Sequence, residues 1–175
     1  MASVEINGYL TQRKLADALQ QIVGDAWAGN EVQIPNSRRR WDMAYRDNET
    51  IVVVEYDGDE HYRNSIRIKV DREKDAVAST AGHKTVRIPY WVQLDNETLL
   101  FYLNLQANVE QEFPHGFIST KLFPASFCEL GIERFERELG ELPERVREDV
   151  LDSLRDRAEE HSVEFVLPTR LRDLI

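Results

Sequence analysis

Hydrophobic and polar residues follow patterns that predict a helix, three strands, a second helix and a fourth strand in the first half of the chain. Apolar residues recur at helical spacing over residues 11–27, after Thr11, a favourable N-cap. Three strands are then expected over residues 31–34, 40–45 and 51–56, and the last contains four consecutive β-branched residues. This order predicts a meander of three strands next to a helix.

The second and third of these strands are predicted to form a hairpin. Residues 46–50 between them are rich in turn formers, and a four-residue loop would pair Arg46 with Ile51. Counting outward from that pair places Asp42 opposite Glu55, and directly opposed residues on an antiparallel pair point to the same face. Asp57 shares that face if the strand continues, so three carboxylates are expected to converge there.

A crossover is predicted after the hairpin. Residues 62–65 are interpreted as an irregular loop, and a helix is expected over residues 66–81, with Val70 and residues 76–78 on its buried side. Residues 84–88 form the next strand. A strand–helix–strand connection implies that residues 51–56 and 85–88 run parallel, in a mixed α/β sheet with a helix on each side.

The second half of the chain is predicted to be mainly helical. Helices are expected over residues 96–106, 126–139 and 144–160, with Val146, Val150 and Leu154 buried, and a short strand over residues 162–167. His115 is interpreted as a loop histidine. The pattern indicates a core over residues 1–107 and a helical C-terminal extension over residues 108–175.

Composition and charge narrow the class of protein. The 175 residues are 42% hydrophobic and include a single cysteine, so an internal disulfide and a zinc ribbon are excluded. No apolar run has membrane-spanning length, and the first ten residues lack a signal-peptide pattern, so a cytoplasmic location and no membrane partner are expected. The net charge of −10, of which −7 lies in residues 101–175, argues against non-specific coating of nucleic acid.

The predicted carboxylate cluster indicates a cation site. Opposed like charges repel, so a fold that brings Asp42, Glu55 and Asp57 together usually neutralises them, and carboxylate oxygens suit Mg²⁺ or Mn²⁺. Three consecutive arginines, residues 38–40, immediately precede this site and are candidates for gripping phosphates. A polar hairpin whose acids face water is the alternative interpretation.

Several short motifs, in order along the chain, resemble the PD-(D/E)xK or restriction-endonuclease-like nuclease superfamily, and most closely its very-short-patch-repair-like group. They are Arg40-Trp41-Asp42-Met43, Val54-Glu55-Tyr56-Asp57-Gly58 with His61, Asp71-Arg72-Glu73-Lys74-Asp75, and Gly82 with Val86-Arg87-Ile88-Pro89. The resemblance covers residues 10–95. It implies a fold of helix, three-stranded meander, helix and strand, and Mg²⁺-dependent hydrolysis of phosphodiester bonds in nucleic acid, with DNA expected rather than RNA.

The resemblance also implies residue roles. Asp42, Glu55 and Asp57 would be metal ligands and, with His61 and Lys69, the catalytic set. Asp57 stands where the superfamily has a lysine, so His61, Lys69 or Lys74 would supply the missing group, and Gln12 and Asp17 replace a first-helix glutamate. Nucleic-acid-binding residues would be Arg38, Arg39, Arg40, Arg63 and Arg67.

Two other functions fit the same sequence. The chain could have kept the nuclease fold without the chemistry, as a module that binds nucleic acid or a protein partner. It could also be an unrelated α/β protein with a polar hairpin. The acidic C-terminal part is expected to face away from nucleic acid, and to contact another protein or a second copy of the chain.

Overall fold

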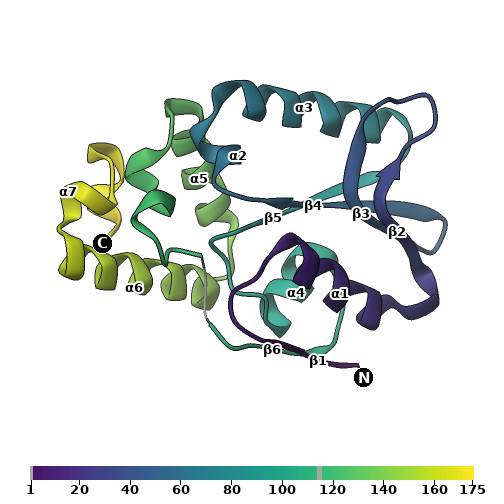
Figure 1. Ribbon diagram of the computed structural model, residues 1–175, viewed down its shortest axis with the longest axis horizontal. Coiled ribbons are helices and arrows are strands. Elements are labelled where there is room, and N and C mark those ends of the chain that lie inside the picture. The colour runs from purple at the N-terminus through teal and green to yellow at the C-terminus, as the bar shows by residue number, and fades with distance from the viewer. Residues whose placement is uncertain (1, 114–115) are drawn as a thin grey trace.

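A mixed four-stranded sheet lies between helices in the computed structural model, which describes residues 2–113 and 116–175 (Figure 1). The strand order is β2-β3-β4-β5, with bounds Trp27–Gln33, Arg40–Asp47, Thr50–Asp57 and Lys84–Pro89. The first three strands are antiparallel neighbours, whereas β5 runs parallel to β4. This arrangement confirms the predicted meander, the crossover and the mixed α/β class.

The β3–β4 hairpin has the predicted register but a shorter loop. Arg46 pairs with Ile51 as expected, and the ladder continues one step to Asp47 and Thr50. The loop therefore has two residues rather than four. Asn48 adopts a φ of 54° in this turn, a left-handed conformation that asparagine tolerates better than most residues.

Helices cover both faces of the sheet, as predicted. Helix α1, Gln12–Val23, lies on one face, and α3, Ser65–Thr80, lies on the other (Figure 1). Thr11 caps α1 by accepting a hydrogen bond of 3.2 Å from the Lys14 backbone N–H. The prediction that α1 reaches residue 27 was wrong, because Gly24 turns the chain at a φ of 56° and Trp27 already pairs in β2.

A short helix replaces the irregular loop expected after His61. Helix α2 spans Glu60–Arg63, directly after β4, and the side chain of Asn64 then caps α3 by accepting hydrogen bonds from two backbone N–H groups. The prediction failed here because a single helical turn has no periodicity that a sequence window can detect.

A second, two-stranded parallel sheet was not predicted. Strand β1, Ser3–Ile6, pairs with β6, Asn108–Gln111, which follows helix α4, Asn96–Leu103. The segment that begins at residue 108 is thus tied to the N-terminus by backbone hydrogen bonds. Both strands alternate exposed and buried residues, but each has only four residues, near the lower limit of strand length.

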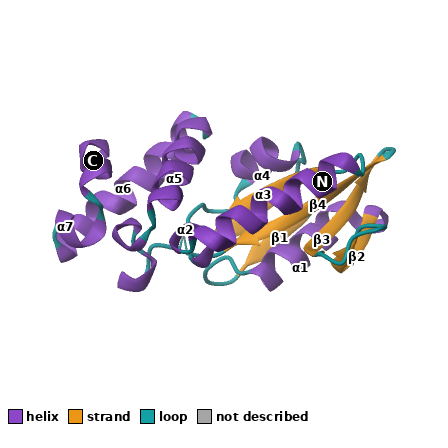
Figure 2. Ribbon diagram, turned by 90° about the horizontal axis from the view of Figure 1, so that it is seen from above, coloured by secondary structure: helices purple, strands orange, loops and turns teal. Residues whose placement is uncertain are grey.

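The C-terminal part is helical, with α5 at Glu129–Glu141, α6 at Glu144–His161 and α7 at Val163–Val166 (Figure 2). Val146, Val150 and Leu154 are buried as predicted. The strand expected over residues 162–167 was wrong, since α7 occupies it. One cluster of buried apolar side chains continues from the sheet into these helices.

The prediction for His115 lies outside the described residues, as does its neighbour Pro114. Among the residues that the structure describes, no helix combines the length and apolar character needed to cross a membrane.

Candidate functional site

Strands β3 and β4 separate at the position of the predicted carboxylates. Their ladder ends at the pair Met43–Val54, so Asp42 and Glu55 are the next residues on either strand. Beyond this point the Tyr56 backbone N–H donates a hydrogen bond of 2.9 Å to Asp42 Oδ2 instead of to a strand partner. Asp42 and Glu55 thus lie on adjacent antiparallel strands, one step beyond their last paired residues, and the predicted direct pairing of the two is replaced by a fork in the sheet.

Glu55 is a buried carboxylate with one cationic partner. Its side chain is 1% exposed, and Lys74 Nζ from α3 lies 2.5 Å from its Oε1. Lys74 is itself buried, with its ammonium 5.4 Å from the centroid of the Trp41 ring. Burial and the nearby charge of Asp42 raise the pKa of Glu55 to about 7, although Lys74 acts in the opposite direction.

Asp42 lines an open pocket on the α1 side of the sheet, whereas Lys74 approaches Glu55 from α3 on the other side. Burial raises the pKa of Asp42, and the charges of Asp57 and Glu31 act in the same direction. The pocket has a volume of about 400 Å³ and is lined from α1, β2 and β3 by Gln12, Arg13, Ala16, Asp17, Asn30, Glu31 and Asp42. The fork thus combines a buried ion pair with a carboxylate at a surface that a ligand can reach.

Asp57, a predicted metal ligand, is held by two arginines. It is buried, and its Oδ1 lies 2.9 Å from Arg87 Nη1 of β5 while its Oδ2 contacts Arg134 Nη2 of α5. Arg87 also binds Asp75 through two nitrogens, at 2.9–3.1 Å. Both oxygens of Asp57 are therefore neutralised by guanidinium groups.

His61 belongs to the same network. Its Nδ1 lies 3.0 Å from Asp57 Oδ1 and 2.6 Å from Asp71 Oδ2, and its Nε2 lies 3.3 Å from Arg67 Nη2. Carboxylates accept and guanidinium groups donate, so this geometry assigns the hydrogen to Nδ1 and the lone pair to Nε2. Burial alone would raise the pKa of Asp71, but His61, Arg87 and Arg134 together lower it.

Ligand atoms of Asp57, His61 and Asp71 lie within 4.8 Å of one another, a spacing compatible with a shared metal ion. A metal at these atoms would have to displace the hydrogen on Nδ1 and approach two guanidinium groups that already balance the carboxylates. The carboxylates of this set are therefore balanced by cations, although Asp71 Oδ1 is buried without a hydrogen-bond partner. We call the set the Asp57 network: Asp57, His61, Asp71, Asp75, Arg87 and Arg134.

Helix α3 buries charged residues that were expected to face solvent. Its buried residues are Ile68, Asp71, Lys74 and Ala78, at helical spacing, whereas Ala76 is exposed. The expected face was right for Ala78, which is buried, and Val77, which packs against it, and wrong for Ala76. The error arose because only apolar residues were assigned to the interior, and here the interior includes acids that need cations. The spacing of Asp71, Lys74 and Asp75 at i, i+3 and i+4 was the available signal.

The remaining predicted residues lie outside the fork. Lys69 is exposed, and it lies five positions before Lys74 and so on another side of α3. Arg38 and Arg40 are exposed, and Arg40 donates to the Glu31 carbonyl at 3.3 Å. Arg39, Arg63 and Arg67 pair with Glu73, Asp59 and Asp71, respectively.

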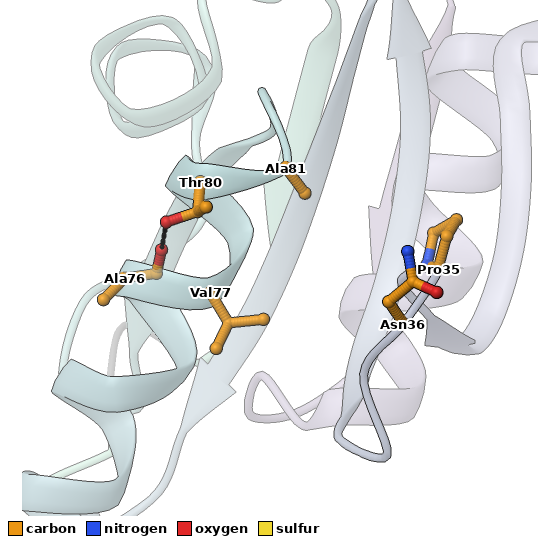
Figure 3. Close-up of a pocket in the computed structure, with 6 residues that line it drawn as sticks. All are labelled: Pro35, Asn36, Ala76, Val77, Thr80 and Ala81. Carbon is orange, nitrogen blue, oxygen red and sulfur yellow. Dashed lines mark hydrogen bonds between the residues drawn. The ribbon is translucent and has the colours of Figure 1, made fainter.

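Another pocket, of about 420 Å³, lies between the β2–β3 connection and the end of α3 (Figure 3). It is lined by Pro35, Asn36, Ala76, Val77, Thr80 and Ala81. None of these side chains is titratable, and Thr80 Oγ1 already donates to the Ala76 carbonyl. This pocket offers no group for acid, base or nucleophilic chemistry.

At the fork, Asp42, whose pKa is raised by burial, lines an open pocket, and Glu55 beside it is buried with a raised pKa. Comparison with known proteins gives no match for this chain among family models, curated proteins or solved structures.

Proposed function

We propose that the chain is a metal-dependent endonuclease with a restriction-endonuclease-like fold that hydrolyses phosphodiester bonds of nucleic acid, and that its substrate is DNA. The element order α1, β2–β3–β4, α3 and β5 supports this proposal, since it matches the order that the sequence resemblance implies. The observation that carries it is the fork, where Glu55, 1% exposed, adjoins Asp42 and has Lys74 Nζ 2.5 Å from its carboxylate.

The residues at the fork fit Mg²⁺ or Mn²⁺. These cations bind oxygen ligands and need only one or two protein carboxylates, because water and substrate phosphates complete their coordination. Asp42 and Glu55 supply those carboxylates, whereas Asp57 does not, because guanidinium groups occupy both of its oxygens. When bound, such a cation acidifies a water molecule and polarises the phosphate.

We assign to Lys74 the role that the strand lysine has in the superfamily, because Asp57 occupies the position of that lysine here. The Lys74 ammonium balances the negative charge of Glu55, and burial against the Trp41 ring keeps it in place. From there it donates hydrogen bonds to a water or a phosphate oxygen that enters the fork. Arg38 and Arg40, exposed at the start of β3, anchor flanking phosphates.

His61 is not assigned as the general base. Its Nε2 accepts from Arg67, and its Nδ1–H is directed at two carboxylates, so neither nitrogen is free to take a proton from water. Its place in the Asp57 network explains its burial without a catalytic role.

A second function is favoured by one observation. Lys74 already neutralises Glu55, so the fork does not need a metal ion to be stable. The same would be true of a module that kept the fold and only binds nucleic acid or a protein. Such a module would bind DNA with the same affinity whether or not Mg²⁺ is present, and it would not cleave it.

The test is cleavage of plasmid DNA, linear DNA, single-stranded DNA and RNA with Mg²⁺, with Mn²⁺ and with chelator, together with calorimetry of Mn²⁺ binding. We expect metal-dependent cleavage that disappears in Glu55→Gln and Lys74→Met and persists in Lys69→Met, a matched lysine on the same helix. Unchanged cleavage in Glu55→Gln, purified in the same way, would contradict the role assigned to Glu55. Binding of DNA without cleavage or metal binding would support the second function.

A further inference from the structure

Helix α5 of the C-terminal part docks directly onto the end of the proposed catalytic strand. A Cβ on Gly131 would lie 1.7 Å from the Tyr62 carbonyl oxygen in α2, so only glycine allows this approach. The Cys128 backbone N–H donates a hydrogen bond of 3.1 Å to the same oxygen. The first turn of α5 is therefore held against the turn that follows β4.

Arg134 extends from this docked helix to β4. Its side chain is buried, its guanidinium lies 4.7 Å from the centroid of the Tyr62 ring, and Nη1 donates to the His61 carbonyl at 3.2 Å. Nε binds Glu138 at 2.6 Å, which leaves Nη2 for Asp57. Because the Arg134 guanidinium is planar and has five N–H donors, it holds the Asp57 carboxylate in one orientation and also neutralises its charge.

Asp57 is a further buried carboxylate on the same strand as Glu55, and it could compete for a cation at the fork. It lies two positions after Glu55 on β4 and so shares its face, and its charge acts on Asp42. Arg87 Nη1 lies 2.9 Å from Oδ1 of Asp57 and 3.2 Å from Oδ2, and His61 Nδ1 lies 3.0 Å from Oδ1, so Arg134 makes the closest contact with Oδ2. Without Arg134, Oδ2 would keep the longer contact with Arg87 and would be more open to a cation close to Glu55 and Asp42.

We propose that Arg134 is a positioning residue of the fork that withholds Asp57 from the cation, so that Asp42 and Glu55 are the carboxylates presented to it. This inference rests on the proposed function and assigns the C-terminal part a role in it. Helix α5 would then be a required part of the nuclease, and not an appendage with a separate task.

The experiment uses the full chain and combines Arg134→Met, Asp57→Asn and the double variant. Mn²⁺ binding is measured by calorimetry, and the stability of the metal-free proteins by urea unfolding. In Arg134→Met we expect Mn²⁺ to bind about tenfold tighter or at an added site, while kcat falls about 10- to 100-fold. Adding Asp57→Asn should remove the extra binding and recover most of kcat. Arg134→Lys should retain near-normal values.

Arg137→Met is the matched control, an exposed arginine three positions along the same helix, and should leave metal binding and kcat unchanged. A purely structural Arg134 would lower stability and the folded fraction with unchanged Mn²⁺ affinity, and Asp57→Asn would not correct the loss. That outcome would overturn the proposal while the nuclease stands. If wild-type protein neither binds Mn²⁺ nor cleaves, the proposed function fails and this inference fails with it. If Arg134→Met does not fold, Arg134→Lys and the double variant decide on the same criteria.

Discussion

Two acids on strand β4 differ in what surrounds them, although both are buried and point to the same face. Glu55 has one ammonium partner and a like-charged neighbour, and its pKa rises to about 7. Asp57 has two guanidinium groups and an imidazole N–H. Burial alone therefore does not identify a reactive carboxylate. The number of cationic partners is what identifies it. A buried acid whose charge is fully balanced by cations is structural, whereas one with too few cationic partners can still bind a metal ion.

The largest effect on stability should come from removing an arginine that neutralises Asp57. Arg87→Met leaves Asp57 and Asp75 without their shared guanidinium, and we expect the free energy of unfolding to fall by about 3–5 kcal/mol. Urea unfolding measures it. A loss below about 1 kcal/mol would mean that the Asp57 network contributes little, and the contrast with Glu55 would disappear.

On the other side, Glu55→Gln should reduce metal-dependent cleavage by at least about 100-fold, equivalent to about 2.7 kcal/mol of transition-state stabilisation. It leaves Lys74 buried beside a neutral amide, so some loss of stability is also expected. Cleavage rates and melting temperatures with and without Mg²⁺ separate the two effects. If the variant keeps full activity, Glu55 belongs with Asp57 as a structural acid.

The pKa of Glu55 predicts a pH dependence of stability. Its value of about 7 in the folded protein exceeds the ordinary 4.5, so the folded state holds this proton more tightly than the unfolded chain does. The stability that this group contributes is fully present below pH 4.5. It decreases as the pH rises toward 7, by at most about 1.4 kcal/mol for each pH unit between these two values.

Metal binding should show the opposite trend, because the cation needs the ionised carboxylate: Mn²⁺ affinity is expected to increase through pH 7. Unfolding and calorimetry between pH 5 and 8 measure both trends. Glu55→Gln should flatten them, and unchanged profiles in that variant would assign the titration to another group.

The smallest effect is expected at Lys69. This lysine is exposed on α3, so Lys69→Met should change the free energy of unfolding by less than about 0.5 kcal/mol and leave cleavage unaltered. Lys74→Met should abolish cleavage, because it removes the only cation within 2.5 Å of Glu55 among the described contacts. Measured side by side, the two variants distinguish between the two helix lysines. Equal losses in both would contradict the assignment of Lys74.

The sheet could be predicted from the amino-acid pattern alone. A run of β-branched residues, turn formers and the strand–helix–strand order indicated β3, β4, α3 and β5, and counting from Arg46 and Ile51 gave the register up to the step before Asp42 and Glu55. These features are local or follow from strand pairing, so periodicity is sufficient to find them. The helices with Val146, Val150 and Leu154 buried follow from the same rule.

Which charges meet inside the protein depends on the assembled fold. A hydrophobicity pattern places Asp71 and Lys74 in solvent, and nothing near Asp57 in sequence shows that Arg134, 77 positions away, will neutralise it. Burying a charge is favourable only when a partner arrives from elsewhere in the chain, so the pairing of these residues is defined once the strands and α5 are in place. The roles of Glu55 and Asp57 differ for that reason, although they lie on one strand, two residues apart.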